Sequence, residues 1–358
     1  MPRGGGAQPT AGDEGCGETA PAGERAAHSR RMAAALVRVG CGVLLVGWPL
    51  VLGRNFYVHV GILVLIHTIG ALSLNLLMRA GLLSFAHAAF MAIGAYTSVL
   101  AMMRLYLPFP LAFLAAGLAP GAIALGIGPI LLRLKGVYFV LVTFAFGEIV
   151  RLIFVNWISL TGGSNGIYGV PGAGLPLPGG ALELASKVAY YYFALAAAGL
   201  AVVLVSRVCA SEMGRALETI SEDELLAECL GIHTVRYKVL GFVAGAVLVG
   251  FAGSLYAHYL RYISPGDFTW RVSLDFIAIN VVGGPRSIAG LLASGVLIVS
   301  LPELLRRAVE YQWILYSLIL ILILAFLPEG IGGLPGRLRG WRARAAGAPV
   351  PGAVAPRG

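Results

Sequence analysis

The sequence predicts an all-α, polytopic membrane protein, and its composition and the lengths of its apolar segments lead to that prediction. Of its 358 residues, 58% are hydrophobic and only 12% are charged, and the mean hydropathy is +0.84. Soluble domains carry about 25% charged residues. The apolar residues gather in runs of about 20, the length that a helix needs to cross about 30 Å of hydrocarbon. We expect about ten transmembrane or half-membrane helices.

The predicted helices follow one another with short polar breaks. They cover residues 36–52, 57–78, 82–103, 109–132, 136–157, 188–205, 239–260, 272–282, 288–305 and 313–327. The eighth would rise only ~16 Å, about half of the hydrocarbon core. This segment is either a half-helix buried in protein beside a transport pathway, or it simply ends in a tight turn at Gly283-Gly284-Pro285.

The two ends of the chain lack hydrophobic periodicity. Residues 1–31 are rich in Gly, Ala, Pro and charge, and predict a disordered cytoplasmic tail, with Met32 as an alternative start. Residues 335–358 predict a basic disordered cytoplasmic tail, so the transmembrane domain covers residues 32–334. The four cysteines form no CxxC motif, which favours free thiols over a zinc site or disulfides.

Basic residues beside the predicted helices indicate the orientation, because cytoplasmic loops carry the excess of Lys and Arg. The cytoplasmic set is Arg25, Arg30, Arg31, Arg38, Arg79, Arg133, Lys135, Arg207, Arg215, Arg236, Lys238, Arg337, Arg339, Arg342 and Arg344. A smaller set falls on the other side: Arg54, Arg104, Arg261, Arg271, Arg306 and Arg307. Both termini are therefore expected in the cytoplasm. The net charge of +9 does not indicate nucleic-acid binding, because these bases form no solvated face with interleaved aromatics.

A polar island, residues 206–238, lies between two long apolar runs on the predicted cytoplasmic side. It holds Glu212, Glu218, Glu222, Asp223, Glu224 and Glu228, whereas the only acids between Arg25 and Ala210 are Glu148 and Glu183. The run from Ser221 to Glu224 fits a capping box, and Gly231 stands where a glycine would end a helix. We expect a short ordered helix, Glu222 to Leu230, that a partner outside the membrane recognises.

Polar groups inside the predicted helices are candidate site residues. Glu148 and Arg151 are three residues apart, so they share a helix face and can pair directly. A charge at the centre of a bilayer costs at least ~2.5–3.5 kcal/mol, so the pair is either part of a substrate path or a structural ion pair near the interface. His87 is more typical of an interhelical hydrogen bond than of a ligand. Glycines at 241, 245, 250 and 253 predict close helix packing.

The chain contains no motif that would supply energy or catalysis. No GxxxxGK[ST], HExxH or His/Cys metal cluster occurs, so we expect a protein that is not an enzyme and binds no metal. Active transport then needs an energising partner. An ion-coupled secondary carrier is the alternative of another class, but only Glu148 and Asp275 are acids near mid-membrane. The polar segment 161–171 predicts either a lid or a docking surface on the far side.

Several segments resemble one family. They are 83–90 (LSFAHAAF), 94–97 (GAYT), 135–139 (KGVYF), 148–151 (EIVR), 156–157 (NW), 161–163 (TGG), 214–217 (GRAL), 230–232 (LGI), 250–256 (GFAGSLY), 264–265 (SP), 283–284 (GG) and 301–305 (LPELL). In this order they resemble the inner-membrane permeases of branched-chain amino-acid ABC importers, of the LivM type, over roughly residues 58–334. Two positions depart from the family pattern: Pro285-Arg286 after the glycine pair, and Glu329 near the closing motif.

The resemblance implies a permease subunit in the bacterial inner membrane that works with a second, LivH-type permease, two ABC ATPase subunits and an extracytoplasmic binding protein. The ATPases, and not this chain, would use ATP and Mg. The implied substrate is a branched-chain or other hydrophobic amino acid, and a related urea or short-chain amide branch is the alternative. Candidate pathway residues are Tyr138, Thr143, Glu148, Arg151, His87 and Asn280. Candidate ATPase-coupling residues are Gly214, Glu222, Asp223, Glu224, Leu225, Leu226, Leu230 and Gly231.

Overall fold

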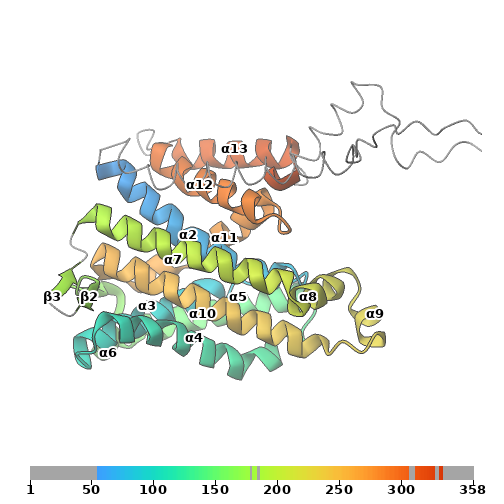
Figure 1. Ribbon diagram of the computed structural model, residues 1–358, viewed down its shortest axis with the longest axis horizontal. Helices are drawn as coiled ribbons and strands as arrows, with labels where there is room; N and C mark the ends of the chain where they lie inside the picture. The colour runs from blue at the N-terminus through green and yellow to red at the C-terminus, as the bar shows by residue number, and fades with distance from the viewer. Residues whose placement is uncertain (1–54, 178–179, 184–185, 306–310, 327–329, 334–358) are drawn as a thin grey trace, which may run out of the picture. The chain divides into compact units, whose positions relative to one another are not determined.

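The computed structural model describes residues 55–177, 180–183, 186–305, 311–326 and 330–333, all within the compact unit Gly53–Gly358 (Figure 1). The predicted helix at 36–52 and both predicted tails lie outside the described residues. The long helices are α2 (Asn55–Met78), α3 (His87–Arg104), α4 (Phe109–Leu131), α5 (Val137–Asn156), α7 (Lys187–Ala210), α10 (Thr234–Leu260), α11 (Trp270–Gly283), α12 (Ile288–Leu305) and α13 (Gln312–Phe326). The all-α fold class is confirmed.

Each of the nine predicted helices within the described residues corresponds to one of these helices. Six helices in the described part of the chain are long and apolar enough to cross a membrane: α2, α4, α5, α7, α10 and α12. The eighth predicted helix becomes α11, which has only 14 residues and ends at Gly283, directly before Gly284, whose φ is +84°. At 1.5 Å per residue it is ~21 Å long, less than the hydrocarbon thickness.

Helices α2 and α10 form the centre of the bundle, and α10 packs against α2, α3 and α4. A Cβ atom on Gly250 would lie 2.2 Å from the Ala116 carbonyl oxygen, and one on Gly253 would lie 2.0 Å from that of Met91. Only glycine permits these approaches, so the predicted close packing is confirmed at both positions. At Gly241 the same test finds ordinary contact, 3.6 Å from Leu217.

The start of α3 differs from the prediction, because residues 82–86 are not helical and the helix begins at His87. Gly81 turns the chain with φ +74°. The amide of Phe85 then donates to Thr143 Oγ1 on α5 (3.2 Å), and that of Ala86 donates to Ser84 Oγ (3.2 Å). These side-chain oxygens accept hydrogen bonds from the amides of an apolar segment that is not helical. Hydropathy cannot predict such contacts, so the helix was expected to begin earlier.

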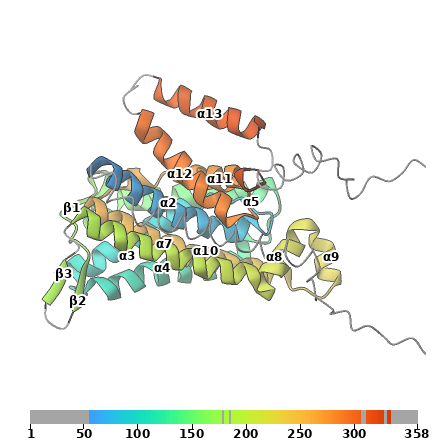
Figure 2. The same cartoon turned by 45° about the horizontal axis from the view of Figure 1, so that its top comes forward.

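Helices α7 and α10 run between two differently built ends (Figures 1 and 2). One end holds α6 (Ile158–Thr161), η1 (Gly163–Asn165), η2 (Pro265–Phe268) and two small antiparallel sheets. In these sheets β1 (Ile167–Tyr168) pairs with β4 (Tyr262–Ile263), and β2 (Gly174–Leu177) pairs with β3 (Gly180–Glu183). The other end holds α8 (Glu212–Glu222) and α9 (Glu224–Cys229), which follow α7 and precede α10.

Candidate functional site

Helix α8 is the support on which the polar island is built. It buries Ala216, Leu217 and Ile220 and exposes its acidic face. Gly214 lies in its first turn, where a Cβ atom would be 2.2 Å from the Cys209 carbonyl oxygen at the end of α7. Glycine is therefore required for the sharp passage from α7 to α8, which turns the chain out of the bundle.

Helix α9 begins two residues later than predicted. The capping box at Ser221 does not form, because Ser221 lies inside the last turn of α8. Asp223 is the N-cap instead, and its Oδ1 accepts from the amides of Leu225 (2.9 Å) and Leu226 (3.1 Å). The break between the two helices falls at Asp223 because that residue is extended, with φ −155° and ψ 110°. A short polar side chain there satisfies amides that the helix itself cannot.

The predicted stop at Gly231 is confirmed. Gly231 has φ +81°, its amide donates to the Glu228 carbonyl (2.9 Å), and the Ile232 amide donates to that of Ala227 (3.0 Å). This pair of bonds is the Schellman arrangement, which needs a left-handed residue and so favours glycine. Helix α9 is thus closed at both ends by local hydrogen bonds.

Glu224 fixes α9 to the bundle. Its carboxylate pairs with Nζ of Lys238 in α10, at 2.6 Å, and with Nζ of Lys135, two residues before α5, at 3.3 Å. Partial burial alone would raise the pKa of Glu224, but the hydrogen bonds and charges of Lys238 and then Lys135 outweigh it and hold the pKa below its ordinary value. Glu228 Oε1 also accepts from Thr234 Oγ1 (2.9 Å). The charged groups of α9 therefore orient it from the side that faces the protein.

The opposite side of α9 carries exposed leucines. Leu225, Leu226 and Leu230 are 72%, 56% and 67% exposed, whereas Ala227 is fully buried. We call these three leucines, with the cap Asp223, the α9 surface. The α9 surface is apolar, exposed and carried by an ordered helix. Exposed apolar surfaces commonly mark interaction sites.

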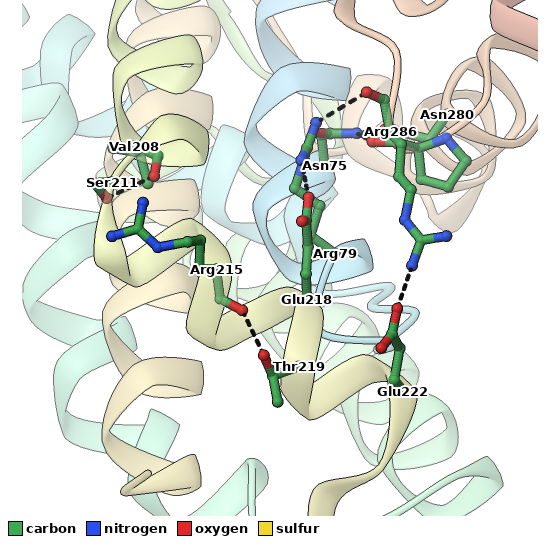
Figure 3. Close-up of polar contacts among 11 residues, drawn as sticks. Asn75, Arg79, Val208, Ser211, Arg215, Glu218, Thr219, Glu222, Asn280 and Arg286 are labelled. Atoms are coloured by element: carbon green, nitrogen blue, oxygen red, sulfur yellow. Dashed lines mark hydrogen bonds and ion pairs between the residues drawn. The ribbon is translucent and has the colours of Figure 1, made fainter. Parts of the chain in front are cut away.

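A chain of polar contacts runs from α8 into the bundle (Figure 3). Arg79, at the end of α2, forms an ion pair with Glu218 of α8, and its Nε donates to Asn75 Oδ1 (3.1 Å). Asn75 Nδ2 donates to Asn280 Oδ1 of α11 (2.8 Å) and to the Pro285 carbonyl (2.9 Å). We call Asn75, Arg79, Glu218 and Asn280 the Arg79 network. The candidate pathway residue Asn280 belongs to this network.

Glu148 and Arg151 form the predicted pair directly, with Arg151 Nε 2.8 Å from Glu148 Oε2. Both side chains are partly exposed, at 27% and 28%. Helix α5 is covered least among the membrane-length helices, since only 11% of its apolar window is buried against 83% for α2. The pair thus lies on a helix that is open on much of its surface.

The other candidate pathway residues occupy different surroundings. Thr143, fully buried, touches the non-helical segment 82–86, while Tyr138 at the start of α5 is 73% exposed. His87 is enclosed at the start of α3, and neither ring nitrogen makes a hydrogen bond of normal geometry with the described residues. A Cβ on Gly245 would lie 3.4 Å from His87 Nε2. The structure therefore brings Thr143 and the segment leading to His87 together, and places Asn280 in the Arg79 network.

Comparison with known proteins shows the family. The family described as "Branched-chain amino acid transport system / permease component" matches residues 56–327. The chain belongs to this family. It is 33% identical to the high-affinity branched-chain amino acid transport system permease protein LivM of Escherichia coli K12 over 309 residues, with 81% of this chain and 72% of that protein covered. LivM of Salmonella typhimurium is 32% identical with the same coverage.

A second permease type is related over a shorter stretch. The E. coli K12 permease protein LivH is 36% identical over 128 residues, which is 35% of this chain and 41% of LivH. No solved structure matches. These relatives are permease components and not enzymes, which supports a multi-pass membrane permease with a second permease as its partner.

Sequence reasoning missed one part of this permease: Arg79 and Glu218 as a pair. In the sequence, Arg79 indicates only the orientation, as a basic residue beside a predicted helix. A signal was present, because Asn75 and Arg79, like Glu218 and Glu222, are spaced four apart and so share a face of their helix. The sequence does not contain the distance between those two faces.

Proposed function

We propose that this protein is the permease subunit of an ATP-driven ABC importer, and that the α9 surface docks on an ABC ATPase. The observation that carries the proposal is that Leu225, Leu226 and Leu230 stand exposed on a helix that is capped at both ends and held by Glu224. A pre-ordered apolar surface binds with little loss of conformational entropy, which suits a contact that transmits force. The chain has no P-loop, so the energy comes from the partner.

The charges around α9 support a cytoplasmic location for this end. Lys135, Lys238, Arg79 and Arg286 all form ion pairs with acids of α8 or α9. An end rich in Lys and Arg faces the cytoplasm. Glu222 and Asp223, at the rim of the α9 surface, would meet basic residues of the ATPase and would affect partner choice and association rate more than affinity.

We propose that the second permease covers the open side of α5, with the substrate path between the two subunits. In α5 (Val137–Asn156), Glu148 lies about 16 Å from the start of a helix of about 30 Å, and Arg151 lies about 8 Å from its end, so Glu148 is near the middle of the helix. Lipid contact at that depth would be costly, whereas a protein surface or a water-filled path accepts a charged pair. The segment 82–86 supports this placement, since irregular backbone at membrane depth occurs beside protein or a cavity.

A hydrophobic amino acid delivered by an extracytoplasmic binding protein suits such a path. Its zwitterionic group needs charges of both signs, which Arg151 and Glu148 supply, while apolar side chains of α5 accept its side chain. Two other candidate polar groups lie on the same helix: Thr143, which is buried against the segment 82–86, and Tyr138, at the start of α5. Uptake of labelled leucine against labelled urea into proteoliposomes distinguishes this substrate class from the amide branch.

Co-purification tests the docking proposal. The wild-type complex, extracted in mild detergent, is expected to retain ATPase subunits, and the triple substitution Leu225→Ser, Leu226→Ser, Leu230→Ser is expected to release them. Leu105→Ser is the matched control, because Leu105 is 68% exposed but lies beyond α3, at the end opposite α9. Retention of the ATPase by a folded triple variant would contradict the proposal, as would an equal loss from the control.

A further inference from the structure

Arg79 joins three parts of the permease that are far apart in sequence. Its guanidinium uses Nη1 for Glu218 of α8, Nε for Asn75 of α2 and Nη2 for the Arg286 carbonyl (3.3 Å). The side chain is only 7% exposed. A buried guanidinium with all three nitrogens engaged is held in one geometry, because a lost partner would leave a desolvated charge.

The turn between α11 and α12 is the second part of the connection. Residues 284–287 are tied to α2 by Asn75, which donates to the Pro285 carbonyl, and to α8 by Arg286, which pairs with Glu222 at 3.3 Å. The latter pair is open to solvent, with both side chains more than two-thirds exposed. It is therefore much weaker than the Arg79–Glu218 contact.

Space remains between α8 and this turn. A cavity of 640 Å³ is lined by Arg79, Glu218, Ser221, Pro285 and Arg286, among others. Glu218 lines this cavity, and Glu222 lies one turn further along α8, in the exposed pair with Arg286 (Figure 3). Helix α8 thus has a strong contact at Glu218 and a weak contact at Glu222 on the same face. The cavity beside Glu218 leaves the helix room to tilt.

We propose that Arg79 is a positioning residue that transmits displacement of α8 and α9 to Asn280 and the α11–α12 turn. When the ATPase moves α9, α8 pivots about the Arg79–Glu218 contact while the exposed Arg286–Glu222 pair opens or closes. Because Arg79 holds Asn75, and Asn75 holds Asn280, the pivot acts on the half-length helix α11. This inference rests on the proposed docking of α9 and names the residues that carry its motion into the membrane.

The test separates transmission from mere support. The full transporter in proteoliposomes, with its ATPases and binding protein, is assayed for ATP hydrolysis and for leucine uptake per ATP. Arg79→Gln is expected to keep the ATPase bound and hydrolysing, while uptake per ATP falls about tenfold, within the range of ordinary coupling energies. Arg215→Gln is the matched control, because Arg215 lies on α8 but points away from Arg79 and is exposed (Figure 3).

Two further variants keep the result decisive if Arg79→Gln folds poorly. Glu218→Gln keeps an acceptor for Arg79 at a partly exposed site and is expected to uncouple uptake from hydrolysis to a smaller degree. The swap Arg79→Glu with Glu218→Arg restores the ion pair but not the donation to Asn75 and the Arg286 carbonyl. It is expected to restore the amount of folded complex without restoring uptake per ATP.

The opposite results overturn the inference. If uptake and hydrolysis fall together in proportion to the amount of folded complex, or if the charge swap restores uptake per ATP, Arg79 only supports α8. Failure of the wild-type permease to retain an ATPase is a separate result, because it contradicts the docking of α9 before any Arg79 variant is compared.

Discussion

Glu218 and Glu222 lie one turn apart on the same face of α8, yet the arginines that they bind differ sharply in burial. Arg79, beside Glu218, is 7% exposed, and Arg286, beside Glu222, is 68% exposed. Solvent screens the second pair and leaves the first largely unscreened. One helix face therefore carries a firm contact and a loose one.

Double-mutant cycles should measure this difference. Arg79→Gln with Glu218→Gln is expected to give an interaction energy of roughly 1–3 kcal/mol, and Arg286→Gln with Glu222→Gln roughly 0–1 kcal/mol. The measurement is thermal or denaturant unfolding of the purified permease in detergent. Equal interaction energies for the two pairs would contradict the assignment of Arg79 as the firm contact.

The capping hydrogen bonds of Asp223 should contribute measurably to the local stability of α9. Asp223→Ala removes the acceptor for the amides of Leu225 and Leu226 and is expected to cost about 1 kcal/mol of local stability. Hydrogen exchange of those two amides should accelerate about fivefold. Asp223→Ser retains a capping oxygen and is the control that should exchange close to the wild-type rate.

The stability that Glu224 contributes should depend on pH. Its pKa is lower in the folded protein than its ordinary value of 4.5, so its contribution is complete above pH 4.5 and is lost as the pH falls through the folded-state pKa. Glu224→Gln is expected to destabilise the permease by roughly 1–3 kcal/mol at neutral pH. The difference in melting temperature between variant and wild type should shrink at about pH 4 and below. A difference that stays constant with pH would exclude an ionic role for Glu224.

The close approach of α10 to α3 should tolerate no side chain. Gly253→Val places carbon atoms within 3.0 Å of Met91 and Ala95 backbone atoms, which cannot move aside, and is expected to cost roughly 1–3 kcal/mol or more. Gly199→Ala is the matched control in α7, since nothing lies within 4 Å of its Cβ position. The control should gain roughly 0.5–1 kcal/mol from helix propensity. Size-exclusion melting curves in detergent compare the two variants.

Hydropathy predicted the helices well because burial in lipid or protein demands long apolar runs. The nine predicted helices within the described residues were all found, and α12 has the predicted bounds. Hydropathy misses the polar ends of helices, so α7 and α10 extend five residues beyond their predicted bounds into the polar island, and it misses the start of α3, where a side chain competes for a backbone group. Thr143 captures the Phe85 amide from another helix, and no local pattern around Phe85 announces it.

The candidate site was predictable where it depends on local backbone geometry, and not where it depends on which elements pack together. Gly231 ended α9 as predicted, because a left-handed residue is a local requirement. The N-cap was misassigned to Ser221 because Ser221 and Asp223 are both good caps, and the choice depends on where α8 stops. The pairing of Arg79 with Glu218 spans 139 positions, so it follows only from the packing of α2 against α8.

The open side of α5 has a consequence for the life of the protein in the cell. A subunit synthesised without its partner would expose the Glu148–Arg151 pair to lipid, where thinning of the bilayer or entry of water must relieve the charge. A subunit without its partner would therefore disturb the bilayer locally. If a second permease covers α5 as proposed, the abundance of this subunit in the cell is expected to follow that of its partner.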